Sequence, residues 1–568
     1  MKLLASLLIL FYCLLCFEFS VIASPTEKTS DPTFEELEAM DFDALMNLKI
    51  QSVSKKEEKL ADAAAAVFVI SQEDIRRSDA TVIPELFRMV PGMQVARIDS
   101  NKWAVTSRGS NSRFANKLLV LIDGRSIYTS YFSGVYWDEH NLVMEDIERI
   151  EIIRGPGGTL WGANAVNGVI NIITKHSKNT LGGMVSTGMG SEERGIGTFR
   201  YGKELAKDKT IRVYGKYYNR DEFAGKPEEP SADSWDGYRG GFRMDWKKSA
   251  TNSFTFQGDY YNGETDERAK ENVVSGSSTS SFDRTVKIDG INFLTRWEHK
   301  KSNNSELTTQ FYFDHASRRG ATTKRNIVDT YDFDFQYRLQ LGEKQKIIWG
   351  AGQRFIVDSF EDSVAIQLNP RNRLSYITSA FIQDDIQILP NRLKLTLGSK
   401  FELNNYTGIE VQPSIRALWT PEKNHSFWAA ISRAVRTPTR AEDSIRINSR
   451  FSGANLVALI GSDLVKSEEA LAFELGYRTQ AKKNLFFDAA LFYSFYDNLQ
   501  TREQGASFTE NTPSPTHTVI PFTENNEGSG KTYGVELFSK WNVKENWELS
   551  ASFTYFKLDL DQVATSSF

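Results

Sequence analysis

The chain has 568 residues, and its 68 basic and 73 acidic side chains give a formal net charge of −5 at neutral pH. A nucleic-acid-binding protein usually carries a basic excess, so this charge argues against that class of protein. After the first two dozen residues, no apolar run approaches the roughly 18 residues of a membrane helix. A polytopic helical membrane protein is therefore excluded, whereas a β-barrel is not, because polar residues that face the lumen dilute its lipid-facing residues.

The N-terminus has the features of a signal peptide. Lys2 precedes an apolar core at residues 3–17, and Val21-Ile22-Ala23 supplies the small-residue cleavage pattern, so we predict cleavage after Ala23. An uncleaved membrane anchor is the alternative. Cys13 and Cys16 are the two cysteines of the chain, so the mature protein would have neither disulfides nor a thiolate site. Export without disulfides is typical of a bacterial envelope protein.

The next segment, residues 24–60, is polar and too short for a domain. Phe34, Leu37 and Met40 are spaced three apart, which favours a short amphipathic helix. Residues 48–54 alternate apolar and polar side chains, which predicts an extended strand. The charged run at residues 55–59 is most simply a solvated stretch.

Residues 61–178 have the pattern of a compact α/β domain. Ser71 followed by Asp74 predicts a capped helix start, and a second helix is predicted from Val82 to Met89, where Pro91-Gly92 ends it. Apolar runs bounded by turn residues predict four strands: Val67–Ile70, Leu118–Ile122, Ile147–Ile153 and Gly168–Thr174.

Residues 179–568 have a different pattern from the preceding domain. They contain many predicted strands, each with one apolar and one polar face. We count about 16 to 18 such segments, separated by turns or long polar loops. Aromatic residues near the strand ends and an export signal favour an outer-membrane β-barrel over a soluble β-sandwich or solenoid. Clear examples are residues 254–260, 307–313, 393–403 and 547–555.

The long run Glu148–Thr174, which includes Arg154-Gly155-Pro156-Gly157-Gly158 and Trp161-Gly162, closely resembles the end of the plug domain in TonB-dependent outer-membrane receptors. Earlier plug motifs of the same family match in the expected order, and so do segments of its barrel. These are Val90–Met93, Ser107–Gly109, Val120–Arg125, Ala380–Asp385, Ser432–Pro438 and Tyr533–Leu537. The resemblance covers essentially the whole mature chain.

The resemblance implies a mainly β fold, with an N-terminal α/β plug domain inside an antiparallel transmembrane β-barrel. It implies a receptor of the bacterial outer membrane that binds a scarce, bulky ligand, such as a ferric siderophore or a cobalamin-like chelate, and transports it actively into the periplasm. The implied partners are TonB with its inner-membrane energising complex, outer-membrane lipid and the metal chelate. No cofactor and no enzymatic activity are implied. The predicted domains are a signal peptide (1–23), a periplasmic segment (24–60), the plug (61–178) and the barrel (179–568).

The plug motif of the family maps onto twelve residues here. Glu151 and Arg154 are expected inside the barrel, where they either couple the plug to the wall or satisfy the plug's own fold. The glycines are expected to serve turn geometry, since no Lys-Ser/Thr follows them as in a phosphate-binding loop. The twelve residues are Arg108, Gly109, Asp123, Gly124, Glu151, Arg154, Gly155, Pro156, Trp161, Gly162, Gly168 and Asn171.

The TonB box of the family corresponds to the strand predicted at residues 48–54. An extended peptide that pairs its backbone with the edge of a periplasmic partner needs little specific sequence, which explains why the motif is weak. An ordinary linker is the alternative. The residues are Leu48, Lys49, Ile50, Gln51, Ser52, Val53 and Ser54.

Ligand contacts are expected at the plug apices and the extracellular loops. Exposed aromatic rings with a few cations suit a bulky, partly planar and anionic chelate, and ferric siderophore, haem and cobalamin all stay open. Packing against the barrel wall is the alternative for each residue. The six histidines show no metal-ligand spacing, so no metal site is predicted. The candidates are Asn101, Lys102, Trp103, Asn111, Arg113, Tyr128, Tyr131, Phe132, Tyr136 and Trp137.

A non-energised porin or an adhesin-type receptor shares the barrel, but a porin needs no plug, and no enzyme motif is present.

A family member should have about 22 strands, yet Trp547–Leu558 is followed by Asp559–Phe568, which alternates poorly. We therefore expect the chain to lack roughly four to six C-terminal strands of the barrel.

Overall fold

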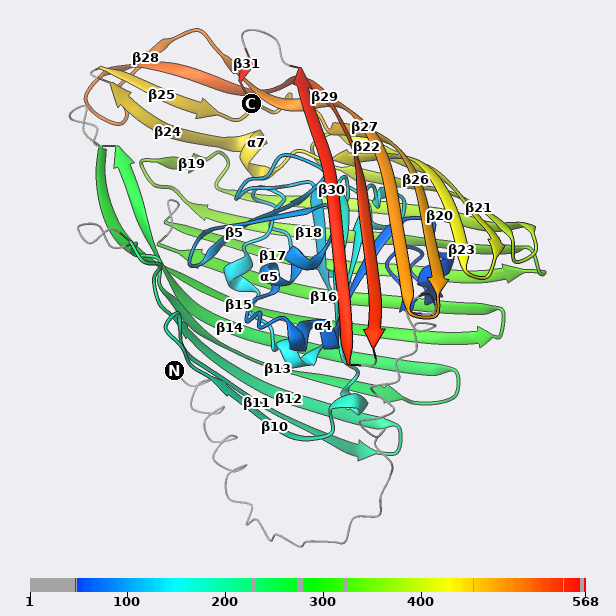
Figure 1. Ribbon diagram of the computed structural model, residues 1–568. Coiled ribbons are helices and arrows are strands. Elements are labelled where there is room, and N and C mark those ends of the chain that lie inside the picture. The colour runs from blue at the N-terminus through cyan, green and yellow to red at the C-terminus, as the bar shows by residue number, and fades with distance from the viewer. Residues whose placement is uncertain are drawn as a thin grey trace, which may run out of the picture.

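A computed structural model of the chain shows a large curved sheet wrapped around a smaller domain (Figure 1). It describes Met46 and residues 48–225, 231–272, 279–320, 324–452, 454–544, 546–561 and 566–567. The predicted signal peptide and the predicted helix around Phe34–Met40 lie outside these residues. No helix in the described part of the chain is long and apolar enough to cross a membrane.

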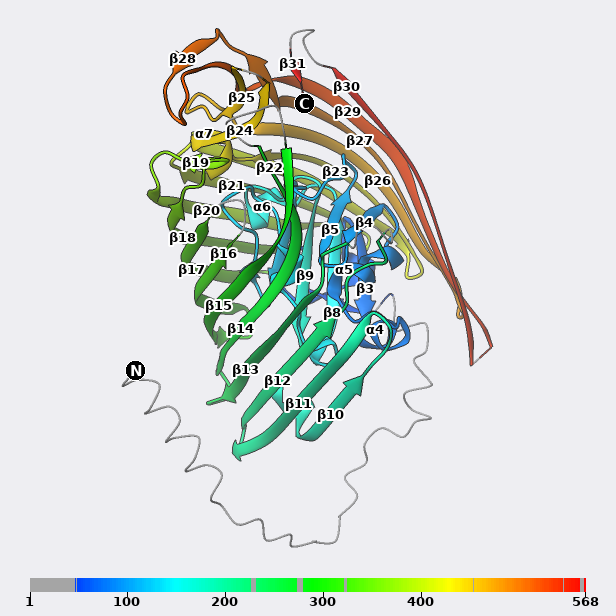
Figure 2. The same cartoon turned by 90° about the vertical axis from the view of Figure 1, so that its left-hand side faces the viewer.

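The wall of the molecule is one 22-stranded sheet whose neighbouring strands follow almost strictly in sequence order. Its long strands are antiparallel and joined alternately by short turns at one end and longer loops at the other (Figures 1 and 2). They are β10 (Gly182–Gly188), β11 (Glu193–Ala206), β12 (Lys209–Arg220), β13 (Trp235–Lys247), β14 (Asn252–Asn272), β15 (Thr279–Ser302), β16 (Ser305–Arg319), β17 (Arg325–Leu341), β18 (Gln345–Glu361), β20 (Asn372–Leu389), β21 (Leu393–Asn404), β22 (Gly408–Glu422), β23 (His425–Arg436), β26 (Glu468–Lys482), β27 (Leu485–Gln504), β29 (His517–Lys544) and β30 (Trp547–Asp561).

Short elements of the loops lie together at the long-loop end of the wall (Figure 1). One of their pairings, between β25 and β29, is parallel. Within the described residues, β10 and β30 each pair along one side only, so the sheet curves around the plug without closing. The short elements are β19 (Ile366–Leu368), α7 (Arg440–Ser444), β24 (Ile445–Ser452), β25 (Asn455–Ile460), β28 (Phe508–Glu510) and β31 (Ser566–Ser567).

The strands of the wall have their polar face inside. In β21, Lys400 and Glu402 are each 6% exposed, whereas their neighbours Phe401 and Leu403 are 46% and 41% exposed. A soluble sheet shows the opposite arrangement, and an outward apolar face is what a bilayer requires. The predicted alternation at residues 393–403 is therefore confirmed.

Exposed tryptophans mark the short-turn end of the wall. Trp349, Trp419, Trp541 and Trp547 all lie within a few residues of a short turn, and each is between 43% and 52% exposed. Amphipathic aromatic rings prefer the interface between lipid and water, so this end of the wall corresponds to one membrane surface. Barrels of the outer membrane place their short turns on the periplasmic side.

The smaller domain, the plug, is built on a five-stranded sheet in the order β3-β8-β9-β6-β7, with a separate β4–β5 hairpin. Strands β8 and β9 are central, and Ile150, Ile152, Ile170 and Ile172 are fully buried in its core. The strands are β3 (Ala66–Ser71), β4 (Met93–Asp99), β5 (Lys102–Ser107), β6 (Leu118–Ile122), β7 (Arg125–Ser126), β8 (Ile147–Arg154) and β9 (Gly168–Thr174).

Helices of the plug are short. Ser71 caps α4 through a capping box with Asp74, as predicted, because its side chain accepts from the Asp74 N–H. The second predicted helix is split into α5 and a 3-10 turn. The helices are η1 (Leu60–Asp62), α4 (Gln72–Arg77), α5 (Ile83–Leu86), η2 (Phe87–Met89), η3 (Trp137–Glu139), η4 (Met144–Asp146), α6 (Gly158–Trp161) and η5 (Ser177–Thr180).

The segment before the plug differs from its prediction. Of the strand predicted at residues 48–54, only β1 (Lys49–Ile50) is extended, and it pairs with β2 (Glu58–Lys59). Residues 52–54 form a turn instead. A tertiary contact causes this difference, because the turn is hydrogen-bonded to the plug, as described below.

Candidate functional site

A buried cluster of charges joins the plug to the wall. Arg108 donates from Nε to Glu536 Oε1 at 2.7 Å and from Nη1 to Glu474 Oε1 at 2.6 Å. Arg154 lies 2.9 Å from Glu536 Oε2 and donates to the carbonyl oxygen of Pro91 at 3.1 Å. The Arg108 side chain is 4% exposed and that of Glu536 is fully buried. Charges this deep are stabilised only by good pairing, so the cluster holds plug and wall in one arrangement.

The same cluster extends to the start of the plug. Arg478 of β26 donates to Asp488 of β27 at 2.6 Å and also to the carbonyl oxygens of Leu60 and Ala65. Arg478 is fully buried. We call Arg108, Arg154, Arg478, Glu474, Asp488 and Glu536 the seam cluster.

Electrostatics inside the seam cluster favour the charged form of Arg108. Burial alone would lower the pKa of Arg108, but the nearby carboxylates of Glu536 and Glu474 outweigh burial and raise it above its usual value. A glycine makes the approach possible. Gly155 has φ +95°, and a Cβ there would lie 2.4 Å from Glu474 Oε1. The motif glycine therefore serves close packing against the wall as well as turn geometry.

Glu151 has a different role from its motif neighbour Arg154. Its carboxylate accepts from the N–H of Gln51 at 3.0 Å and from the N–H and Oγ of Ser52 at 2.8 and 2.6 Å. Asn171 donates to Ser52 Oγ and Trp161 Nε1 donates to Ser52 O. Among the described residues Glu151 makes no hydrogen bond or ion pair with the wall. Arg154 is therefore paired with the wall, whereas Glu151 is bonded to the N-terminal segment.

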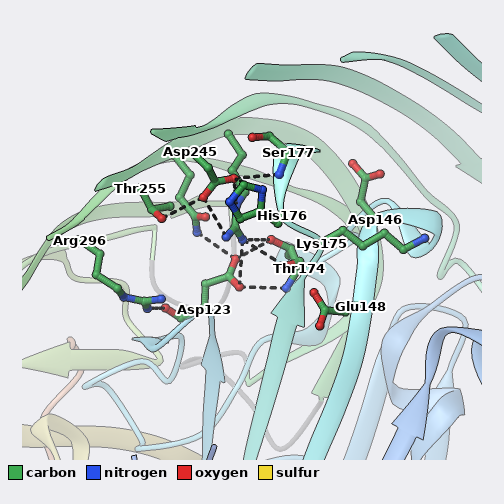
Figure 3. A network of polar contacts seen from close by, with 12 residues as sticks. Asp123, Asp146, Glu148, Thr174, Lys175, His176, Ser177, Asp245, Thr255 and Arg296 are labelled. Carbon is green, nitrogen blue, oxygen red and sulfur yellow. Dashed lines mark hydrogen bonds and ion pairs between the residues drawn. The ribbon is translucent and has the colours of Figure 1, made fainter. Parts of the chain in front are cut away.

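A second junction with the wall lies at the other end of the plug sheet (Figure 3). The carboxylate of Asp123 accepts from Thr174 N at 2.9 Å, Thr174 Oγ1 at 2.8 Å and Gln257 Nε2 at 2.9 Å, and the Asp123 carbonyl accepts from Arg296. Three residues after Thr174, the N–H of Ser177 donates to Asp245 of β13 at 2.8 Å. We call this set of contacts the Asp123 junction. It pins the last plug strand where the chain passes into the wall.

Four aromatic rings gather at the plug apex. Phe132 lies 5.0 Å from both Phe114 and Tyr136 and 6.4 Å from Tyr131, measured between ring centroids. Arg113 lies 5.4 Å from the Phe114 ring, which is 51% exposed. Burial raises the pKa of Tyr136 to about 12, so its phenol is neutral. We call Phe114, Tyr131, Phe132 and Tyr136 the apex cluster. Sequence reasoning missed Phe114, although it adjoins the candidate Arg113.

Several candidate ligand residues are placed elsewhere. Asn101 is 1% exposed and donates to the carbonyl oxygens of Asp233 and Asp266. Trp103 is 2% exposed and packs 6.0 Å from Trp235. Trp137 is also buried. These three offer no surface to a ligand, so packing, the alternative reading, describes them in this structure.

The remaining candidates divide between local contacts and an internal cavity. Lys102 pairs with Asp99 at 2.9 Å. Asn111 donates to the carbonyl oxygen of Ala104. Tyr128 lines a cavity between plug and wall, where it lies 6.0 Å from Arg354.

A wall loop contacts the apex directly. In α7, whose start is capped by a Thr439–Glu442 capping box, Arg440 N donates to Ser130 O at 3.2 Å and Ala441 N donates to Tyr131 O at 2.9 Å. Arg440 is fully buried against Asp358. The Thr-x-x-Glu spacing at residues 439–442 was a sequence signal for this helix start.

Buried titratable groups surround Glu139 where the plug meets Arg239 and Arg318 of the wall. Burial, reinforced by Asp138 and opposed by Arg318, raises the pKa of Glu139 to about 7. Burial and the nearby Arg239 lower the pKa of His140 well below its usual value. No group of His, Cys, Asp and Glu side chains in the described residues is arranged to hold a metal ion. These buried groups serve the contact between plug and wall.

Two family models match the chain. One described as TonB-dependent receptor plug domain matches residues 59–169, and one described as TonB-dependent receptor-like β-barrel matches residues 182–567. Among curated proteins, a vitamin B12 transporter of Vibrio vulnificus is 23% identical over 547 residues, which cover 91% of this chain and 83% of the relative. An iron-regulated outer membrane virulence protein of Vibrio cholerae is 23% identical over 87% of this chain and 76% of the relative.

Solved structures show the same fold. A mutant of the ferric enterobactin receptor of Pseudomonas aeruginosa superposes with a TM-score of 0.71 at 16% identity, covering 87% of this chain and 80% of that one. The siderophore receptor PirA of Pseudomonas aeruginosa superposes with a TM-score of 0.67 at 17% identity, covering 87% and 86%. The mainly β fold with a plug inside a large antiparallel sheet is thus that of known receptors.

Proposed function

The chain belongs to the family of TonB-dependent receptors, and from this premise we propose that it binds a bulky metal chelate and transports it actively across the bacterial outer membrane. Members of this family are transporters and not enzymes, and its relatives include siderophore and vitamin B12 transporters. A non-energised porin or an adhesin-type receptor is the alternative, and the seam cluster argues against the porin. A passive pore has no use for a plug held in its lumen by buried ion pairs.

The apex cluster is the observation that supports ligand binding. Its exposed Phe114 ring and the half-buried Tyr131 lie where the extracellular loops of the wall meet the plug. Arg113 makes no ion pair with a carboxylate among the described residues, so its charge is available. Aromatic rings beside a free guanidinium favour a planar, anionic ligand, such as a ferric siderophore, over a neutral one. A cobalamin-like ligand is the second candidate, because a vitamin B12 transporter is among the relatives.

Replacing Arg113 with alanine should weaken the binding of ferric enterobactin about 10- to 100-fold, since a hydrogen bond to a charged group contributes about 1.5–3 kcal/mol. The measurement is a titration of the detergent-solubilised chain with ferric enterobactin and, separately, with cyanocobalamin. Arg76→Ala, which removes an exposed arginine paired with Glu73 on the plug, is the matched control and should leave the affinity unchanged. Tight cyanocobalamin binding that ignores Arg113, with no ferric enterobactin binding, would reverse the ligand assignment.

Residues 48–54 are proposed as the TonB box. The support is their position before the plug and the exposure of Lys49, whose side chain is 71% exposed. Ser52 is 1% exposed and hydrogen-bonded to Glu151. A partner strand can therefore pair with this segment only after those hydrogen bonds break. A segment stored in this way couples the state of the plug to partner binding.

The domain boundaries and the route of export belong to the same proposal. We propose a plug of residues 61–178 and a wall from residue 179, and the starts of β3 at Ala66 and β10 at Gly182 support these bounds. A signal peptide ending at Ala23 would deliver the chain to the periplasm. TonB with its inner-membrane complex, outer-membrane lipid and the chelate are the proposed partners.

A further inference from the structure

A short helix of the wall, α7, is docked on residues 129–134 of the plug, called the apex loop here (Figure 1). The first N–H groups of a helix have no partner inside the helix and must find one elsewhere. In α7 the first two are those of Arg440 and Ala441, which donate to Ser130 O at 3.2 Å and to Tyr131 O at 2.9 Å. Carbonyl oxygens of the plug therefore complete the start of a wall helix.

Buried ion pairs fix α7 to the wall on its other sides. Arg440 is fully buried, and its Nε lies 3.1 Å from both carboxylate oxygens of Asp358 on β18. Glu442, which closes the capping box, accepts from Arg436 Nη1 at 2.9 Å, and Arg436 Nε donates to Glu468 at 2.6 Å. Because breaking a buried pair on one side is strongly unfavourable, α7 presents its first turn to the plug in one fixed position.

The docking extends the apex cluster onto the wall. The Tyr131 ring lies 5.3 Å from the Phe360 ring of β18, measured between centroids, and the Arg440 guanidinium lies 5.8 Å from the same Phe360 ring. On the plug side of the cluster, Arg318 of β16 lies 4.2 Å from the Tyr136 ring. Rings of the plug and of the wall thus form one aromatic surface, with guanidinium groups beside it.

The apex loop is also tied within itself. Thr129 N donates to Gly134 O at 2.8 Å, and Ser133 N donates to Thr129 O at 2.9 Å. Ser133 has φ 56°, which is uncommon for a non-glycine residue, and a Cβ on Gly134 would lie 2.2 Å from the Phe132 ring. These contacts fix the shape of the loop, and α7 fixes its place against the wall.

We propose that α7 is a brace that presets the apex cluster for its ligand, with Arg440 as the positioning residue. The inference rests on the proposed function, because the apex cluster is the proposed binding surface. Ordering one side chain during binding lowers affinity about two- to tenfold, so a ligand with planar aromatic groups gains from rings that are already ordered. Tyr131 and Phe132 both lie on the apex loop, so the brace should raise affinity about 5- to 100-fold.

Hydrogen exchange of the ligand-free chain tests the docking. The variant is Ala441→Pro, which removes the N–H that donates to Tyr131 O, and Pro84 already occupies the second position of α5, as proline would in α7. Ala441→Ser keeps the N–H and is the matched control. The amides of Thr129 and Ser133 should exchange about five- to tenfold faster in Ala441→Pro, the loss of one hydrogen bond, and at the parent rate in Ala441→Ser. Equal rates in the two variants would overturn the brace.

Titration with ferric enterobactin tests what the brace does for binding. Ala441→Pro and Arg440→Ala should each weaken binding about 5- to 100-fold, whereas Ala441→Ser should bind as the parent chain does. Arg440→Lys keeps a cation beside Asp358 and should recover most of the affinity lost in Arg440→Ala. Parent affinity in Ala441→Pro would overturn the brace while the proposed function stands.

A double-mutant cycle separates positioning from a general loosening of the fold. In a chain that carries Tyr131→Ala and Phe132→Ala, Ala441→Pro should weaken binding no further, because the rings that the brace orders are gone. An additive loss would show that Ala441→Pro acts through the fold, and would overturn the brace. If the parent chain binds no ferric enterobactin, that result counts against the proposed function, and the exchange rates still decide the docking.

Discussion

Replacing Glu536 with glutamine should lower the free energy of unfolding by about 3–5 kcal/mol, the cost of breaking a buried ion pair on one side. Glu536 accepts from Arg108 through Nε and Nη2 and lies 2.9 Å from Arg154 Nη1. The neutral amide leaves both guanidinium groups short of a partner in a site that water does not reach. Denaturant unfolding of the detergent-solubilised chain measures the loss.

The matched control lies on the same hairpin of the wall. Glu548 pairs with Lys540 at 3.0 Å, but their side chains are 30% and 17% exposed, so Glu548→Gln should cost less than about 1 kcal/mol. Equal losses in the two variants would show that the seam cluster does not fasten the plug. A large loss confined to Glu536→Gln supports the view that it does.

Replacing Lys49 with proline should abolish energised uptake while ligand binding stays within about twofold of the parent chain. Leu60 N donates to Leu48 O, so the alternation of an antiparallel pair turns the Lys49 N–H away from β2 and toward an incoming strand. Proline removes that N–H and fixes φ. The measurement compares uptake and binding of the same labelled ferric enterobactin.

A proline at Lys49 tests the TonB box more specifically than a proline at Ile50 would. Ile50 is fully buried in a core with Leu60 and Ala63, so a proline there would also disturb the plug. Lys49→Ala keeps the N–H and removes the same exposed side chain, and it should transport normally. If Lys49→Pro transports as well as Lys49→Ala, residues 48–54 are an ordinary linker.

Local patterns in the sequence predicted most plug elements. The runs Leu118–Ile122 and Gly168–Thr174 are β6 and β9 in the structure, because buried strands between turn residues are apolar throughout. The turn at residues 52–54 was missed, since the bonds that bend it come from Glu151, a residue distant in sequence. An alternating apolar and polar pattern does not show which distant residue will hydrogen-bond to the segment.

The partners of the candidate site were harder to predict than its motif. Arg108 and Arg154 were found in the plug motif, but Glu474 and Glu536 lie more than 300 residues later in the chain. Alternation shows only that such residues face inward, and the position of the plug decides which of them meets an arginine. Trp103 was predicted as a ligand contact but packs on Trp235 in the structure. An aromatic residue beside a turn has the same sequence pattern in both cases.

Energised transport by a plugged receptor requires the proton-motive force. The most direct test is uptake of radiolabelled ferric enterobactin and cyanocobalamin by cells that express the chain, before and after the proton-motive force is dissipated. We expect that one of these ligands accumulates, that accumulation stops when the force is dissipated, and that binding at the cell surface persists. Uptake that continues at the same rate without the proton-motive force would contradict it and would indicate a passive porin.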